Sequence, residues 1–110
     1  MPLSEKVRIE VYLPDLPRAA YQDLLESIDR EFTYTFGGFT AVRGLDGSYL
    51  SRQGLVLKGR INLVFVDAPL LFTEDSERIS RYADHLRQAA FVALEEEAVL
   101  VAAYPVYHSE

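Results

Sequence analysis

The chain has 110 residues, 49% of them hydrophobic, which is the size of one domain and enough apolar material for a core. Its formal net charge of −6 argues against a general nucleic-acid-binding protein, because contacts with phosphates need a basic surface. The lack of cysteine excludes a disulfide scaffold, a cysteine-ligated zinc site and a thiol nucleophile.

The first third of the chain predicts a strand followed by a helix. Residues Lys6–Leu13 alternate between apolar and polar side chains, which is the pattern of a strand with one buried face. We expect Asp15 to cap the next helix, Arg18–Phe32, whose apolar residues recur at three- and four-residue steps. The run Thr33–Phe36 favours extended structure, and Gly37-Gly38 then allows a sharp reversal.

The middle of the chain predicts a long β-hairpin. Positions 55–66 alternate between an almost wholly apolar set and a mixed set, and Phe39–Ser51 offers a partner strand of similar length. The turn lies at Gln53-Gly54 or, in a shorter hairpin, at Asp46-Gly47. We prefer Gln53-Gly54 because it leaves two equal arms, with residues 44–47 as a bulge that bends the first arm.

The last third predicts a second helix and a final strand. Thr73 or Asp75 caps the helix, which runs to about Leu94. The strand covers Ala98–Val106, and Pro105 places it at a sheet edge because proline cannot donate a ladder hydrogen bond. This order of elements predicts an α+β, ferredoxin-like fold, a four-stranded antiparallel sheet with both helices on one face.

The sheet face that the helices leave open is the first candidate site. We expect it to carry side chains from the first and third strands: Arg8, Glu10, Tyr12, Arg60, Asn62, Val64 and Val66. This set is too apolar for a face bare to water, so it predicts contact with a second copy of the chain or with a small molecule. The residues expected to hold a small anionic or aromatic ligand are Arg8, Tyr12, Arg60 and Asn62.

The hairpin is the second candidate site, because it is basic in an acidic chain. Residues 38–66 hold four cations and one anion, a local net charge of +3 that leaves −9 for the remainder. The acidic run Glu95–Glu97 is a solvated turn or, on a neighbouring subunit, the partner of the hairpin cations. The residues expected to make such contacts are Arg43, Arg52, Lys58, Glu95, Glu96 and Glu97.

The sequence carries no catalytic motif. Ser48–Arg52 offers hydroxyl groups beside an arginine, but no nucleophile elbow or phosphate loop accompanies them. His85 and His108 are the only plausible proton carriers, and they lie too far apart in the sequence to suggest a metal site. We therefore predict no metal and no cofactor.

Three stretches, together with the order of elements, resemble short bacterial proteins of ferredoxin-like fold: GLDGSYLSRQG, GRINLVFVDAP and EEEAVLVAAYPVYH. More distantly, the layout looks like that of the nitrogen-regulatory PII signalling proteins and the copper-tolerance CutA proteins. Both are trimers with an extended segment between the second and third strands, and PII proteins bind nucleotides between subunits. No PII binding motif matches residue by residue, so the resemblance implies assembly rather than a reaction.

Two hypotheses follow for the function. The first is a non-catalytic homo-oligomer, a dimer or trimer, with a structural, regulatory or signalling role. The second is a small-molecule-binding protein or enzyme of the dimeric α+β-barrel type, which would use the open sheet face. The first 30 residues carry charges throughout and no long apolar run, so we expect a cytoplasmic protein without a signal peptide or membrane span.

Overall fold

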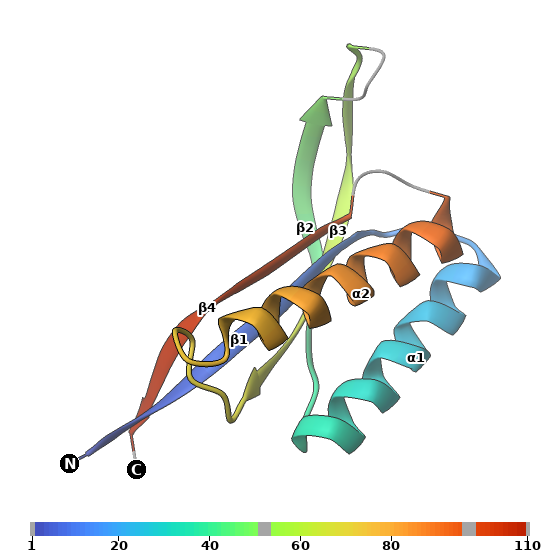
Figure 1. Cartoon of the computed structure of the whole chain (residues 1–110). Coiled ribbons are helices and arrows are strands. Elements are labelled where there is room, and N and C mark those ends of the chain that lie inside the picture. The colour runs from blue at the N-terminus through green and yellow to red at the C-terminus, as the bar shows by residue number, and fades with distance from the viewer. Residues whose placement is uncertain (1, 51–53, 96–98, 110) are drawn as a thin grey trace.

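The computed structural model describes residues 2–50, 54–95 and 99–109. Within them the elements follow the order β-α-β-β-α-β, which confirms the predicted ferredoxin-like α+β fold (Figure 1). The strands are β1 (Leu3–Pro14), β2 (Thr40–Leu50), β3 (Val56–Ala68) and β4 (Leu100–Ser109), and the helices are α1 (Ala19–Phe36) and α2 (Ser76–Leu94). None of the described helices is both long and apolar enough to cross a membrane.

The strands form one antiparallel sheet in the order β2-β3-β1-β4, and both helices cover the same face of it (Figure 1). β1 is central, so that Val7 lies opposite Ala68 of β3 on one side and Pro105 of β4 on the other. Pro105 is therefore in an edge strand, as predicted, where a residue without an N–H is tolerated.

The core lies between the sheet and the two helices. β1 contributes every second side chain to it, as its alternation predicts, and α1 contributes one apolar stripe. Burial of a large apolar side chain stabilises the fold by about 1.5–3 kcal/mol. The buried residues of these two elements are Val7, Ile9, Val11, Leu13, Tyr21, Leu24, Leu25, Ile28 and Phe32.

The predicted orientation of β3 is wrong. Val64 and Val66 lie opposite Val11 and Ile9 and are buried under the helices, and Asn62 faces the same side at 2% exposed. The open face instead receives the other alternate set of β3: Ile61, Leu63, Phe65 and Asp67. Both alternate sets of β3 contain apolar residues, so its alternation does not reveal which set faces the core.

The hairpin is long, as predicted. β2 and β3 remain paired as far out as Leu50 and Val56, and Gly47 lies inside this ladder, which excludes a turn at Asp46-Gly47. The chain reverses between Leu50 and Val56, in agreement with the preferred position, although Gln53 itself lies outside the described residues.

The bulge of the first arm falls at Arg43-Gly44, at the near end of the predicted segment. The register between β2 and β3 shifts between Val42 and Leu45. Gly44 has φ +75°, a left-handed conformation that suits glycine, and such a residue is typical of a bulge. The bulge separates the part of β2 that lies beside the core from the part that projects outward.

α1 ends at Phe36 rather than at Phe32, so the prediction of extended structure over Thr33–Phe36 is wrong. Packing decides the conformation here. The Phe36 ring centroid lies 6.3 Å from that of Phe32 and 5.5 Å from that of Tyr82 on α2. These contacts outweigh the weak preference of the sequence for a strand, and Gly37 then ends the helix at φ +88°.

The two helix starts differ in how well they were predicted. α1 begins after Arg18, so Asp15 lies too early in the chain to cap it, and that prediction is wrong. Asp15 donates its backbone N–H to the carbonyl of Arg60 at 2.9 Å, which ties the connection after β1 to β3. Asp75, one of the two predicted capping residues, occupies the N-cap position of α2, but its side chain makes no capping hydrogen bond. Its carboxylate instead accepts a hydrogen bond from the backbone N–H of Leu71.

β4 begins later than predicted and continues to Ser109, and β1 begins at Leu3. The two strands pair over this whole length, so that Ser4 lies opposite His108. The polar residues at the strand ends hide this extension from an analysis based on apolar alternation. As a result, His108 is part of the sheet.

Candidate functional site

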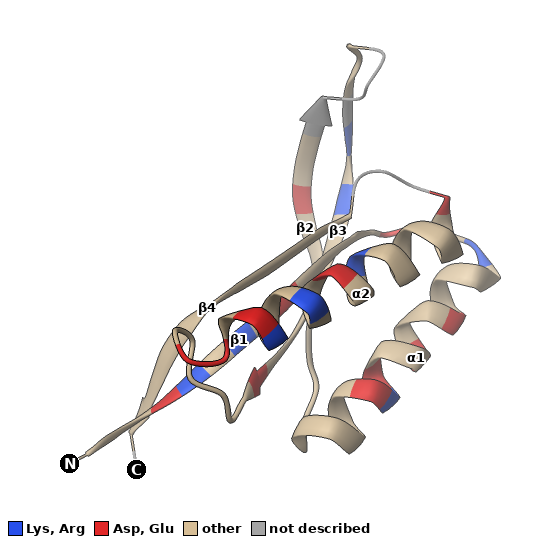
Figure 2. Ribbon diagram, in the orientation of Figure 1, with Lys and Arg blue, Asp and Glu red and all other residues tan. Residues whose placement is uncertain are grey.

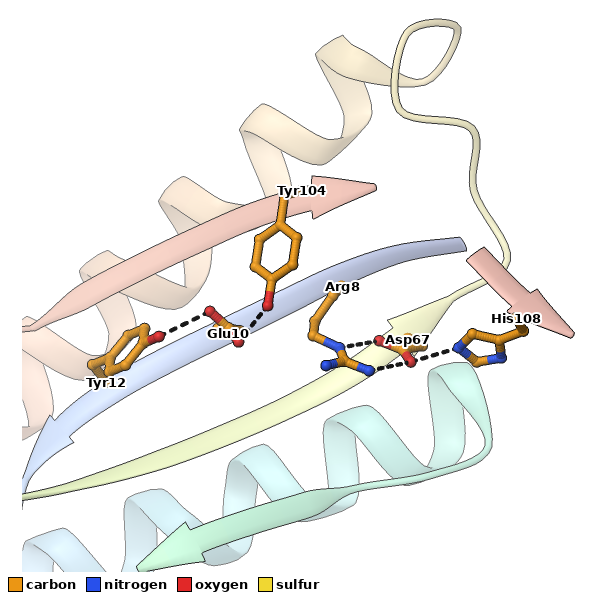
Figure 3. A network of polar contacts seen from close by, with 6 residues as sticks. All are labelled: Arg8, Glu10, Tyr12, Asp67, Tyr104 and His108. Atoms are coloured by element: carbon orange, nitrogen blue, oxygen red, sulfur yellow. Dashed lines mark hydrogen bonds and ion pairs between the residues drawn. The ribbon is translucent and has the colours of Figure 1, made fainter. Parts of the chain in front are cut away.

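Six polar side chains lie in a row on the sheet face that the helices leave open (Figure 3). β1 supplies three of them, β3 one and β4 two: Arg8, Glu10, Tyr12, Asp67, Tyr104 and His108. Antiparallel pairing sets Arg8 opposite Asp67 on one side and opposite Tyr104 on the other. Glu10 and Tyr12 share this face with Arg8 because side chains two residues apart on a strand point the same way.

The first cluster surrounds the carboxylate of Glu10, which is only 8% exposed although it lies on the open face. Its Oε1 accepts a hydrogen bond of 2.9 Å from the Tyr12 hydroxyl, and its Oε2 accepts one of 2.7 Å from the Tyr104 hydroxyl (Figure 3). The hydrogen bond to this carboxylate, followed by burial, raises the pKa of each tyrosine. Both phenols therefore keep their protons and hold the carboxylate in one orientation.

The second cluster surrounds the carboxylate of Asp67. Arg8 donates from Nε to Oδ1 at 2.7 Å and from Nη2 to Oδ2 at 2.9 Å, which is a bidentate ion pair. Nε2 of His108 lies 2.7 Å from the same Oδ2. Arg8, and to a smaller degree His108, hold the pKa of Asp67 below its usual value against the opposing effect of burial. The Arg8 guanidinium also lies 4.5 Å from the Phe65 ring centroid, a cation–π contact.

The six polar side chains of these two clusters are thus paired with one another. Among the described residues, no buried side-chain nitrogen or oxygen lacks a hydrogen-bond partner. In the same part of the chain, no three His, Cys, Asp or Glu side chains are grouped so that they would hold a metal ion. A network whose polar groups are already hydrogen-bonded can be covered by another surface without leaving one of them unsatisfied. The geometry therefore suits an interface.

The four predicted ligand-binding residues do not form one site. Arg8 and Tyr12 lie on the open face. Asn62 points to the core side of β3, and Arg60, two residues before it on the strand, points to the same side. Arg60 lies on the part of the hairpin beyond the core and is exposed. The structure thus separates the predicted set into two pairs on opposite faces of the sheet.

Asn62 has a structural position at the base of the hairpin. Its amide nitrogen donates to the hydroxyl of Tyr21 on α1, and its amide oxygen accepts a hydrogen bond of 3.0 Å from the backbone N–H of Gly44. Burial raises the pKa of Tyr21, so its hydroxyl remains protonated. One buried amide therefore connects the bulge of β2 to the helix layer.

The outer part of the hairpin extends past the rest of the sheet (Figure 1). The pairing of β3 with β1 ends where Ile61 lies opposite Pro14, and residues 56–59 of β3 pair only with β2. We call residues 45–50 and 54–60 the hairpin arm. A two-stranded hairpin is at best marginally stable in water by itself, and this arm exposes apolar side chains, including Val56 at 65%. Such an arm needs a further surface to pack against.

The predicted contact residues fall partly within the described chain. Arg43 and Lys58 are exposed on the hairpin, and Glu95 is exposed at the end of α2, with φ +51°. Figure 2 shows Lys and Arg on the outer part of β3, and Asp and Glu on both helices. The remaining residues of that prediction lie outside the described residues: Arg52, Glu96 and Glu97. The contacts themselves stay a prediction.

Comparison with solved structures identifies the fold. CutA1 from Oryza sativa shares 18% sequence identity over 98% of this chain and 85% of its own length, with a TM-score of 0.59. CPII from Thiomonas intermedia, a nitrogen regulatory PII-like protein bound to ADP, AMP and bicarbonate, shares 14% over 99% of this chain and 100% of its own, with a TM-score of 0.56. This chain has the fold of CutA1 and the PII-like proteins.

The same fold also carries an enzyme. A phage SAM lyase in complex with S-methyl-5′-thioadenosine shares 13% identity over 94% of this chain and 90% of its own length, with a TM-score of 0.57. No protein-family model matches the sequence, and no curated protein sequence matches it either. These likenesses confirm the predicted CutA and PII layout as a fold, and the function has to be argued from the surfaces.

Sequence reasoning placed Arg8, Glu10 and Tyr12 on the open face, but it missed the residues that complete the network there. Asp67 was missed because β3 was assigned the wrong orientation, and His108 because β4 was predicted to end at Val106. The register of the strands is the signal that would have found them. Once Arg8 is set opposite Asp67, the ion pair follows from the two residue types.

Proposed function

We propose that this chain is a cytoplasmic, non-catalytic protein that assembles with copies of itself and has a structural, regulatory or signalling role. The hairpin arm is the observation that carries the proposal. It extends beyond the end of β1, the neighbouring strand, and it exposes apolar side chains such as Val56. A second copy of the chain supplies the missing surface, because a hairpin of this kind is marginal without one.

The charge distribution supports self-association. The segment 38–66 carries a net charge of +3, while the remainder of the chain carries −9. Opposite charges on two surfaces of one molecule attract when two copies meet and set the register between them. Contacts of Arg43 and Lys58 with an acidic surface of a neighbour, including Glu95, are part of this proposal.

The open sheet face supports it as well. The Glu10 and Asp67 carboxylates of this face are hydrogen-bonded within their clusters, and the apolar side chain of Leu100 remains exposed beside Tyr12. A surface that combines satisfied polar groups with exposed apolar ones is typical of protein interfaces. We propose that this face, together with the hairpin arm, is covered in the assembly.

Sedimentation velocity tests the proposal. The chain has a mass of 12.5 kDa, and at tens of micromolar we expect a species of two or three times this mass. Val56→Asp places a charge on the hairpin arm and should shift the distribution to the monomer. Val92→Asp is the matched control, because Val92 is an exposed valine of α2 away from both surfaces. A wild-type monomer, or equal behaviour of the two variants, would contradict the proposal.

A second candidate function is binding of a small anionic or aromatic ligand at the open face, with or without catalysis. The His108 imidazole supports it, since it is partly exposed and held by Asp67 beside the Arg8 guanidinium. An imidazole oriented by a carboxylate can carry a proton. CPII with its bound nucleotides and the phage lyase with its bound nucleoside further support a ligand on this fold.

A thermal-shift screen with nucleotides and small carboxylates separates the two functions. If a ligand binds at the open face, His108→Ala should abolish its stabilising shift. Arg60→Ala should leave that shift unchanged, because Arg60 belongs to the other side of β3. A shift lost in Arg60→Ala and kept in His108→Ala would place the ligand away from the open face. If no compound produced a shift, self-assembly would be the one function that remains.

A further inference from the structure

Two arginines and a histidine lie close together on α2, on the side of the protein away from the open sheet face. Arg78, Arg81 and His85, together with Tyr82, line an open hollow of about 350 Å³. At about 100° per residue, these four side chains fall within an arc of about 100° around the helix. They therefore share one face of the helix, although they are not consecutive in the sequence.

The basic side chains of this hollow are not engaged in strong ion pairs. The contact of Arg78 with Asp75 is long, at 3.5 Å, and the Arg78 side chain is 68% exposed, so the pair is worth little. Within the part of the chain that the structure describes, Arg81 and His85 make no ion pair and no side-chain hydrogen bond. Glu77 lies one turn before Arg81 without reaching ion-pair distance. Two guanidinium groups and an imidazole are thus available to a ligand.

Tyr82 gives the hollow a fixed aromatic wall. Its ring packs edge-on against Phe36 of α1, with 5.5 Å between the centroids, and its hydroxyl donates to Glu31 Oε1 at 3.0 Å. The same oxygen accepts a hydrogen bond from Thr35 at 3.3 Å. Burial and the bond to Glu31 raise the pKa of Tyr82, so its hydroxyl stays protonated. The nearby carboxylate is therefore engaged by two hydroxyl donors on α1 and α2.

We propose that this hollow binds a phosphate group, either free or carried by a small molecule. A guanidinium presents paired N–H donors that match the oxygens of a phosphate, and two of them with an imidazole surround a small anion. The volume is at the lower end of that of small-molecule sites and leaves room for an organic part against Tyr82. A long polyanion such as a nucleic acid is not the expected ligand, because the acidic remainder of the chain would repel it.

This site is independent of self-association. It lies on the helix layer, whereas the interface argued above comprises the open face and the hairpin arm. Chemical-shift mapping of ¹⁵N-labelled protein tests it, with inorganic phosphate and AMP titrated separately at constant ionic strength and sodium chloride as the reference. We expect saturable shifts centred on residues 78–85. Tighter binding of AMP would identify a phosphate monoester as the ligand, and binding of phosphate alone would identify the free ion.

Variants on the same helix decide whether the hollow is responsible. Arg81→Ala should weaken binding at least tenfold. Arg78→Lys should weaken it several-fold, because lysine keeps the charge but lacks the paired N–H donors of the guanidinium. Arg87→Ala is the matched control, since Arg87 is exposed and lies about 180° around α2 from Arg78. Equal losses in Arg81→Ala and Arg87→Ala, or shifts that chloride reproduces, would show diffuse charge screening and overturn the proposal.

Discussion

Arg8 of β1 and Asp67 of β3, 59 residues apart in the chain, are joined across the open face by two hydrogen bonds of 2.7 and 2.9 Å. We expect Asp67→Asn to lower the free energy of unfolding by about 1–3 kcal/mol, because it leaves Arg8 without its counterion on a partly covered surface. Urea denaturation measures this change. Asp23→Asn, at an exposed position of α1, is the control and should have no effect.

The same pair predicts how stability depends on pH. The guanidinium of Arg8 lowers the pKa of Asp67 in the folded chain. A carboxyl group of this kind stabilises the fold above its unfolded pKa of about 3.9, and the contribution is lost as the pH falls through the folded pKa. The difference in urea midpoint between wild type and Asp67→Asn should shrink as the pH falls below about 5 and should close in stronger acid. A difference that persists at the lowest pH would contradict this account.

The two tyrosines that hold Glu10 should act together. Tyr12→Phe and Tyr104→Phe each remove one donor from a buried carboxylate, and each should cost about 1–2 kcal/mol. The double variant should cost more than the sum, because it leaves the carboxylate with neither donor. A double-mutant cycle from urea denaturation measures the coupling. Tyr34→Phe, at a tyrosine that is 86% exposed, checks that loss of a hydroxyl alone is harmless.

Replacement of Asn62 should loosen the base of the hairpin. Asn62→Leu keeps the approximate volume but leaves the Tyr21 hydroxyl and the Gly44 N–H without the partner that they have now. We expect a loss of about 2–4 kcal/mol, since two polar groups become unsatisfied at once. Hydrogen exchange gives a local readout, and the Gly44 amide should exchange faster relative to amides of β1. Unchanged protection of Gly44 would refute the role assigned to this amide.

Two paired glycines of the hairpin arm should respond differently to alanine. A Cβ on Gly47 would lie 2.1 Å from Ile61 Cδ1 and 3.0 Å from Ile61 Cγ1, whereas a Cβ on Gly59 would have no atom within 4 Å. Gly47→Ala should therefore cost about 1–3 kcal/mol through overpacking, and Gly59→Ala should be close to neutral. Thermal unfolding of both variants measures the contrast. Equal effects would mean that Ile61 moves aside freely.

The sequence alone predicted the order of elements and the edge position of β4. The alternation of β1 and the missing N–H of Pro105 are local properties that survive in any register. The orientation of β3 was not predictable in this way, because both of its faces are apolar. The continuation of α1 through Phe36 depends on contacts with Tyr82, which is remote in sequence.

The candidate site shows the same division. Arg8 and Tyr12 were assigned to the open face from local alternation, and the structure places them there. Their partners required the pairing of strands that are remote in the sequence: Asp67 through β3, and Tyr104 and His108 through β4. A short sequence pattern does not encode such a register, because it is set by the core and by the hairpin turn.

The amide of Asn62 has a geometric consequence for the hairpin arm. It fastens the bulge at Gly44 to the helix layer, so the arm leaves the sheet in one direction instead of swinging about its root. In an assembly of identical subunits, a fixed exit direction repeats the same rotation at every contact. Repetition of one rotation gives a ring of defined size when that rotation closes and a regular filament when it does not, whereas a loose hinge would give assemblies of mixed size.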